Sequence, residues 1–71
     1  DIYNANGHVN LGVCALVRND LSKARKLFEQ ALDCDPSHAE ALYNLGITLL
    51  KQNQPEDALG FFRRLGEFAI W

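Results

Sequence analysis

The sequence predicts an all-α fold made of two tandem helix-turn-helix units, and two observations predict it. Between Leu42 and Leu49 the apolar residues follow the i, i+3, i+4, i+7 spacing of one helical face. The same frame occurs 34 residues earlier in the chain, where Leu11-Gly12 takes the place of Leu45-Gly46. A helical pattern that recurs at this period indicates that the chain contains one structural unit twice.

Prolines and small residues define the second unit. Pro36 is expected to open its first helix and Pro55 its second, because proline suits the first helical position. Gly46 lies inside a helix, where glycine costs about 1 kcal/mol relative to alanine. That cost is tolerable if the missing side chain lets another helix approach. We therefore expect Ala58 to face Gly46, with Phe62 filling the space one turn further on.

The first unit is expected to contain the same two helices. One should run from about Ala5 to Arg18, with Asn4 as its N-cap. The other should run from about Leu21 to Cys34 after a turn at Asn19-Asp20, with Asp20 as its N-cap.

Several positions agree between the two units, among them Leu11 with Leu45, Gly12 with Gly46, Asn19 with Asn53, Ala24 with Ala58, and Phe28 with Phe62. The order Leu-Gly, then Ala-x3-Phe-x2-Ala, then Pro resembles the tetratricopeptide repeat (TPR) family. The resemblance covers the whole chain, with repeat one at about 5–38 and repeat two at about 39–71. It implies a short right-handed α-solenoid, and we expect residues 1–71 to be one segment of a longer array. The second unit departs from the pattern with Leu65 in place of alanine and Ile70 in place of proline.

Composition and charge narrow the classes of partner. The 71 residues are 48% hydrophobic, so we expect one small ordered domain. The formal net charge is −2, and because no basic stripe is present we do not expect nucleic acid as a partner. No apolar run approaches the roughly 20 residues that span a bilayer. We expect a cytoplasmic protein without a membrane span.

We expect no enzymatic activity, no cofactor and no metal. The sequence shows no H-E-x-x-H motif, no P-loop and no Ser/His/Asp set in a plausible frame. Glu56 and Asp57 are adjacent, but neighbouring side chains diverge by about 100° around a helix, so they indicate first-turn acids. Cys14 and Cys34 are interpreted as two reduced thiols. The alternative, a zinc site shared with the two histidines, lacks the C-x2-C spacing of a zinc module.

The TPR resemblance implies a binding groove, because the first helix of each hairpin lines the concave face of stacked repeats. Asn10 and Asn44 occupy equivalent positions, and their amides can bond the backbone of an extended or helical ligand. Val13 and Ile47 would contact its apolar side chains. The alternative is that these asparagines are ordinary solvated helix residues. The predicted partner-binding residues are Asn6, Val9, Asn10, Val13, Tyr43, Asn44, Ile47 and Lys51.

Two narrower resemblances imply different partners. The run Glu40–Gly46, followed by Thr48 and Lys51, is similar to the large tetratricopeptide subunits of the intraflagellar transport B complex. This implies a scaffold in a cilium or flagellum. Asn44 also matches a polar position of the repeats that clamp the terminal carboxylate of chaperones, which implies a co-chaperone-like adaptor for short linear peptides. Valines stand where the first unit of that clamp carries Lys and Asn, and Lys51 alone does not make the positive groove that a carboxylate needs.

The apolar ends of the chain also need a partner. Each unit in a stack buries one face against the next, and about three repeats are usually required for stability. This chain has two, and its tail Phe68–Trp71 is apolar. We therefore expect neighbouring repeats or a second copy of the chain to cover the apolar ends.

Overall fold

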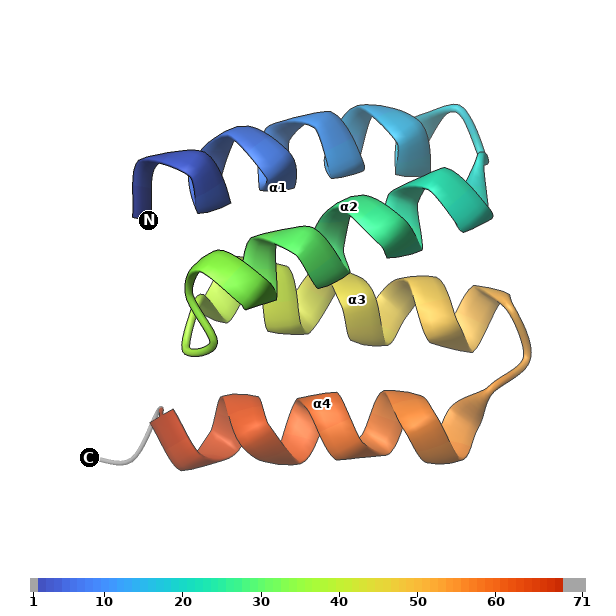
Figure 1. Cartoon of the computed structure of the whole chain (residues 1–71). Helices are drawn as coiled ribbons and strands as arrows, with labels where there is room; N and C mark the ends of the chain where they lie inside the picture. The colour runs from blue at the N-terminus through green and yellow to red at the C-terminus, as the bar shows by residue number, and fades with distance from the viewer. Residues whose placement is uncertain (1, 69–71) are drawn as a thin grey trace.

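A computed structural model describes residues 2–68 of the chain and shows two α-helical hairpins packed side by side (Figure 1). Consecutive helices run antiparallel, and each packs against the next along the chain, while α1 also touches α3. This confirms the predicted all-α fold of two helix-turn-helix units. The helices are α1 (Ile2–Val17), α2 (Leu21–Cys34), α3 (Ala39–Lys51) and α4 (Pro55–Phe68).

Two predicted helix starts are corrected by the structure. Helix α1 begins at Ile2, so Asn4 lies inside its first turn and is not the N-cap. Helix α3 begins at Ala39, because the backbone after α2 is held in a turn. In that turn the Asp35 carboxylate accepts hydrogen bonds from the backbone N–H and the hydroxyl of Ser37, at 3.2 and 3.0 Å. Pro36 therefore belongs to the turn and does not open α3.

The turn inside each hairpin has the same geometry, as the repeat pattern predicts. Asn19 and Asn53 both adopt the left-handed conformation, with φ of 63° and 62°. In the first turn the N–H of Asn19 bonds to the carbonyl of Leu16, and the N–H of Asp20 to that of Ala15. These two bonds define a Schellman motif, which satisfies carbonyls that the helix end leaves unpaired. The Asp20 side chain then caps α2 by accepting from the N–H of Lys23, as predicted.

The helices of each hairpin approach closely at a glycine. A Cβ placed on Gly12 would lie 2.6 Å from Cε1 of Phe28, and one placed on Gly46 would lie 2.5 Å from Cε1 of Phe62. The predicted role of both glycines is confirmed, but Gly46 meets the Phe62 ring instead of Ala58. Ala58 is fully buried all the same, so a small residue there serves the close packing of α3 and α4.

Three polar contacts hold the two hairpins in one arrangement. The His38 ring accepts from the N–H of Ala41 at Nδ1, and its other nitrogen, Nε2, lies 2.7 Å from Oδ1 of Asn6. A neutral ring with its proton on Nε2 satisfies both bonds, so His38 caps α3 and also joins it to α1. Arg64 donates to the Pro36 carbonyl from α4, and Arg25 donates to Gln54 from α2.

Candidate protein-binding surfaces

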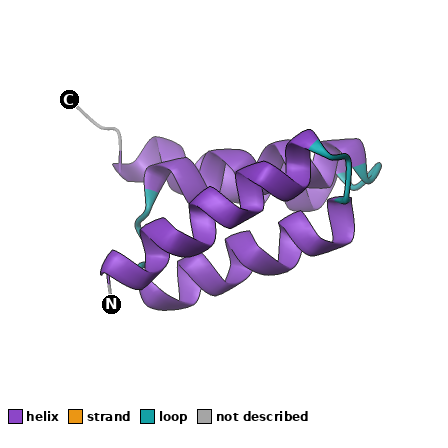
Figure 2. Ribbon diagram, turned by 90° about the horizontal axis from the view of Figure 1, so that it is seen from above, coloured by secondary structure: helices purple, strands orange, loops and turns teal. Residues whose placement is uncertain are grey.

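The two sides of the molecule differ in how the hairpins meet. The first helices, α1 and α3, touch each other, whereas α2 and α4 make no close backbone contact within the described residues. Figure 2 shows the four helices from a second direction, with the loops at the two ends of the helix array. One side of the molecule is therefore formed by α1 and α3. On the other side, α2 and α4 do not meet, and both pack against α3.

Most of the predicted binding residues are accessible on the α1–α3 side. Four are exposed, three are partly buried and one is buried. The exposed residues are Asn6, Asn10, Tyr43 and Lys51; the partly buried ones are Val13, Asn44 and Ile47; the buried one is Val9.

Val9 is the one predicted binding residue whose side chain is unavailable to a partner. It is 1% exposed and belongs to the hydrophobic core. Its equivalent in the second unit, Tyr43, is 51% exposed and lies 6.2 Å from Phe62, measured between ring centroids. The sequence pattern treats the two positions alike, but the packing of α1 onto its neighbours covers only the first. We therefore remove Val9 from the candidate surface and retain Tyr43.

The asparagines on this side differ in whether their side chains are hydrogen-bonded within the described residues. Asn6 is bonded to His38 and so contributes to the junction between the hairpins. Asn10 is exposed and Asn44 is partly buried, and neither side-chain amide has a hydrogen-bonding partner among residues 2–68. Each amide can donate two hydrogen bonds and accept two, so the pair can bond the backbone of another polypeptide. Val13 and Ile47 lie one turn further along each helix.

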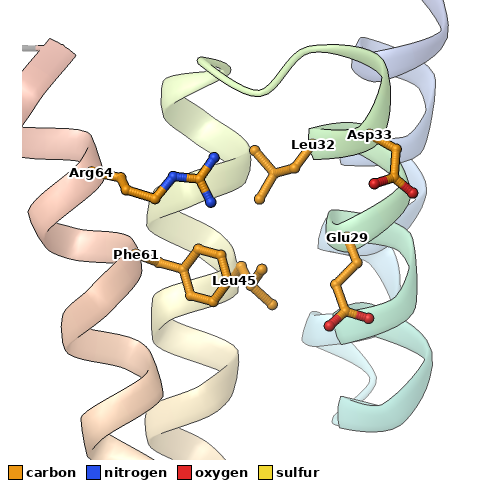
Figure 3. Close-up of a pocket in the computed structure, with 6 residues that line it drawn as sticks. All are labelled: Glu29, Leu32, Asp33, Leu45, Phe61 and Arg64. Carbon is orange, nitrogen blue, oxygen red and sulfur yellow. The ribbon is translucent and has the colours of Figure 1, made fainter.

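On the opposite side, the separation of α2 and α4 leaves a groove that the sequence pattern did not predict (Figure 3). Phe61 and Arg64 extend from α4 toward α3, and Glu29 and Asp33 lie across from them on α2. No sequence motif indicates such a groove, because it depends on how far apart two helices lie that are not consecutive. We call it the α2–α4 groove; it is lined by Glu29, Leu32, Asp33, Leu45, Phe61 and Arg64.

A second hollow lies on the first hairpin, between α1 and α2, and we call it the α1–α2 face. Leu11 in this face is 60% exposed, although its equivalent Leu45 in the second hairpin is fully buried. Leu45 is buried because α2 of the first hairpin packs against α3. Within the described residues, Leu11 has no corresponding helix over it. The face is lined by Leu11, Cys14, Ala15, Arg18, Asp20, Lys23 and Leu27.

Neither a metal site nor a membrane span occurs among the described residues. They contain no group of three or more His, Cys, Asp or Glu side chains able to hold a metal ion. Cys14 is exposed and Cys34 partly buried, and both thiols are free. None of the helices α1 to α4 combines the length and the apolar character needed to cross a membrane.

This fold and these surfaces define a helical-repeat protein of the class that binds other polypeptides. Two family profiles, both described as tetratricopeptide repeat, match the chain, one over residues 5–38 and the other over residues 27–60. The chain belongs to the tetratricopeptide repeat family, whose repeats mediate protein–protein interaction and are in general non-catalytic. A search of curated proteins gives no significant match. The first profile coincides with the predicted first repeat, whereas the second straddles the junction between the two hairpins.

Proposed function

We propose that this chain is a non-catalytic scaffold segment that holds a partner polypeptide against the α1–α3 side. The observation that carries the proposal is the pair of amides at Asn10 and Asn44. They stand at equivalent positions of the two repeats, and neither is bonded within the described structure. Hydrogen bonds from such amides to a peptide backbone would fix its register, while Val13 and Ile47 contact its apolar side chains.

The finer proposal is a place in the intraflagellar transport machinery for cilium assembly. Its support is the similarity of Glu40–Gly46, Thr48 and Lys51 to the large tetratricopeptide subunits of the B complex. In that setting the chain is a segment of a cytoplasmic protein that works in the cilium or flagellum. Tyr43 and Lys51 are exposed on α3 and can meet a partner, so the similarity includes accessible positions as well as core positions.

The second candidate function is a co-chaperone-like adaptor for short linear peptides. Its support is Asn44, a polar position shared with the repeats that clamp a terminal carboxylate. The geometry offers that ligand little else, because Val9 is buried and Lys51 is the one cation on this side among the predicted binding residues. The adaptor predicts binding of a peptide with a free C-terminal carboxylate, and this binding should be abolished when the terminus is amidated.

Partners should be sought by affinity purification of the parent protein from ciliated cells, with mass spectrometry of the bound proteins. We expect the double variant Asn10→Ala/Asn44→Ala to lose partners that the natural protein retains. Gln30→Ala, which removes an exposed amide from α2, is the matched control and should retain them. Circular dichroism must show equal helical content in all variants. If the double variant and the control retain the same partners, the α1–α3 side is not the binding surface.

We further propose that the α1–α2 face is covered in the functional protein by a neighbouring repeat or by a second copy. The support is the contrast between Leu11, which is 60% exposed, and Leu45, which is fully buried where α2 packs against α3. An apolar side chain at this position of the repeat is therefore suited to burial under a helix. Sedimentation of the isolated chain should show self-association that weakens in Leu11→Ser. A stable monomer at high concentration would count against a second copy as the occupant.

A further inference from the structure

We infer that the α2–α4 groove is a second docking site, for a polypeptide segment that carries an aliphatic anchor with a lysine or arginine beside it. The inference rests on the proposed function only in assuming that the ligand is a polypeptide. The site itself is different, because the groove lies on the side opposite to the contact between α1 and α3. Nothing in the repeat pattern assigns a ligand to this side.

The accessible apolar surface of the groove suits an aliphatic anchor and comes mainly from Phe61. Leu45 lies beneath the groove and is fully buried, while Leu32 on α2 is 8% exposed. Phe61 on α4 is partly buried and directs its ring toward Leu45 (Figure 3). Burial of one more apolar side chain here would gain roughly 25 cal/mol for each Å² of apolar surface removed from water.

The α2 wall of the groove is acidic. Glu29 and Asp33 are four residues apart on α2, so their carboxylates lie on the same face of the helix. Asp33 has no cationic partner among residues 2–68. Glu29 is paired with Arg25 at 3.3 Å, with 36% of the Arg25 side chain and 50% of the Glu29 side chain exposed, and ion pairs near the surface contribute only about 0–1 kcal/mol. Both carboxylates are therefore available to a cation brought by a partner.

The α4 wall of the groove is basic and fixed in place. Arg64 donates from Nη2 to the Pro36 carbonyl at 3.0 Å, and its guanidinium lies 5.6 Å from the centroid of the Phe61 ring. A cation on this wall would be repelled, whereas a cation on the opposite wall would meet Glu29 and Asp33. The charges thus commit the occupant to one orientation, with its basic side chain toward α2 and its anchor against Phe61.

The groove stays open when further repeats are added to the stack. A unit that packs before the first hairpin would cover the α1–α2 face, which includes Leu11. The residues that line the α2–α4 groove belong to the junction between the two described hairpins. Docking there is therefore compatible with a longer array and with a partner on the α1–α3 side.

The test uses short acetylated and amidated helical peptides in an alanine and glutamine background. The probe carries one leucine and one lysine a helical turn apart, and two further peptides replace the lysine by glutamate or the leucine by serine. Binding is followed by chemical-shift changes of the isotopically labelled full chain. We expect the lysine peptide to shift the amides around Glu29, Leu32 and Phe61. Asp33→Asn should weaken binding by about two- to fivefold, and Glu29→Gln/Asp33→Asn by more.

Glu56→Gln is the matched control, because it removes an exposed carboxylate from the first turn of α4. It should bind the lysine peptide as the natural chain does. The inference is overturned if the glutamate peptide binds equally well, if no shifts appear at millimolar peptide, or if the shifts fall around Asn10 and Asn44. The last result would leave the proposed function standing, since it places the ligand on the α1–α3 side. Failure of the proposed function itself appears separately, as insensitivity of captured partners to the Asn10/Asn44 double variant.

Discussion

Replacing Gly12 by alanine should destabilise this protein, although alanine is the better helix former. Gly12 lies inside α1, where the substitution would gain about 1 kcal/mol of helix propensity. The new Cβ would lie 2.6, 2.9 and 3.0 Å from three carbons of the Phe28 ring. Phe28 is fully buried, so the ring cannot swing into solvent, and overpacking of this kind costs about 1–3 kcal/mol.

Gly60 provides the matched control. It lies inside α4, is exposed, and has nothing within 4 Å of the position that a Cβ would occupy. Gly60→Ala should therefore stabilise the protein by about 1 kcal/mol. Because the propensity gain is common to both variants, the difference between their unfolding free energies isolates the overpacking cost of about 1–3 kcal/mol.

Thermal unfolding followed by circular dichroism measures this difference. For a chain of this size, 1 kcal/mol corresponds to a shift of about 4–8 °C in Tm, so Gly12→Ala should melt at least about 4 °C below Gly60→Ala. Shortening the ring with Phe28→Leu should reduce the penalty of Gly12→Ala in a double-mutant cycle. If both alanine variants raised Tm equally, the close approach of Phe28 to Gly12 would be refuted.

Three further predictions concern residues that the repeat places at special positions. Leu45→Ala should cost about 2–5 kcal/mol of unfolding free energy, because it leaves a cavity in the core. Leu11→Ala, at the exposed equivalent position, should change the unfolding free energy by less than about 0.5 kcal/mol. Equal losses in chemical denaturation would contradict the difference in burial. His38→Ala should cost about 1 kcal/mol through loss of the α3 cap, and His38→Asn should recover most of that loss; the comparison fails if the two variants unfold at the same denaturant concentration. Asn53→Ala should cost about 1–2 kcal/mol of unfolding free energy because the φ of Asn53 is positive, whereas Asn53→Gly should be tolerated. In thermal melts, Asn19→Ala should likewise be less stable than Asn19→Gly.

The sequence by itself determined the helices, their turns and the close approach within each hairpin. These features depend on neighbours in the chain: the apolar spacing on one helical face, asparagine in the turn, and glycine where the next helix comes close. The residue that meets Gly46 was not predicted, because Ala58 was expected there and the structure places the Phe62 ring. The Asp20 cap and the start of α4 at Pro55 were predicted for the same reason. The predicted start of α3 at Pro36 was wrong because of a local interaction that the pattern does not include. Asp35 accepts hydrogen bonds from Ser37, which hold the backbone in a turn, and α3 begins at Ala39.

Only the tertiary structure decided which equivalent positions are buried. Leu11 and Leu45 are identical residues in identical frames, yet one is 60% exposed and the other fully buried, because α2 packs over α3 of the second hairpin. At the equivalent positions Val9 and Tyr43 the burial is reversed, because Val9 in the first unit is buried and Tyr43 in the second is exposed. The α2–α4 groove likewise exists because two helices that are not consecutive lie apart, and a periodic pattern carries no information on that spacing. Burial depends on what lies against a side chain in space, whereas periodicity reports only the face of the helix on which it stands.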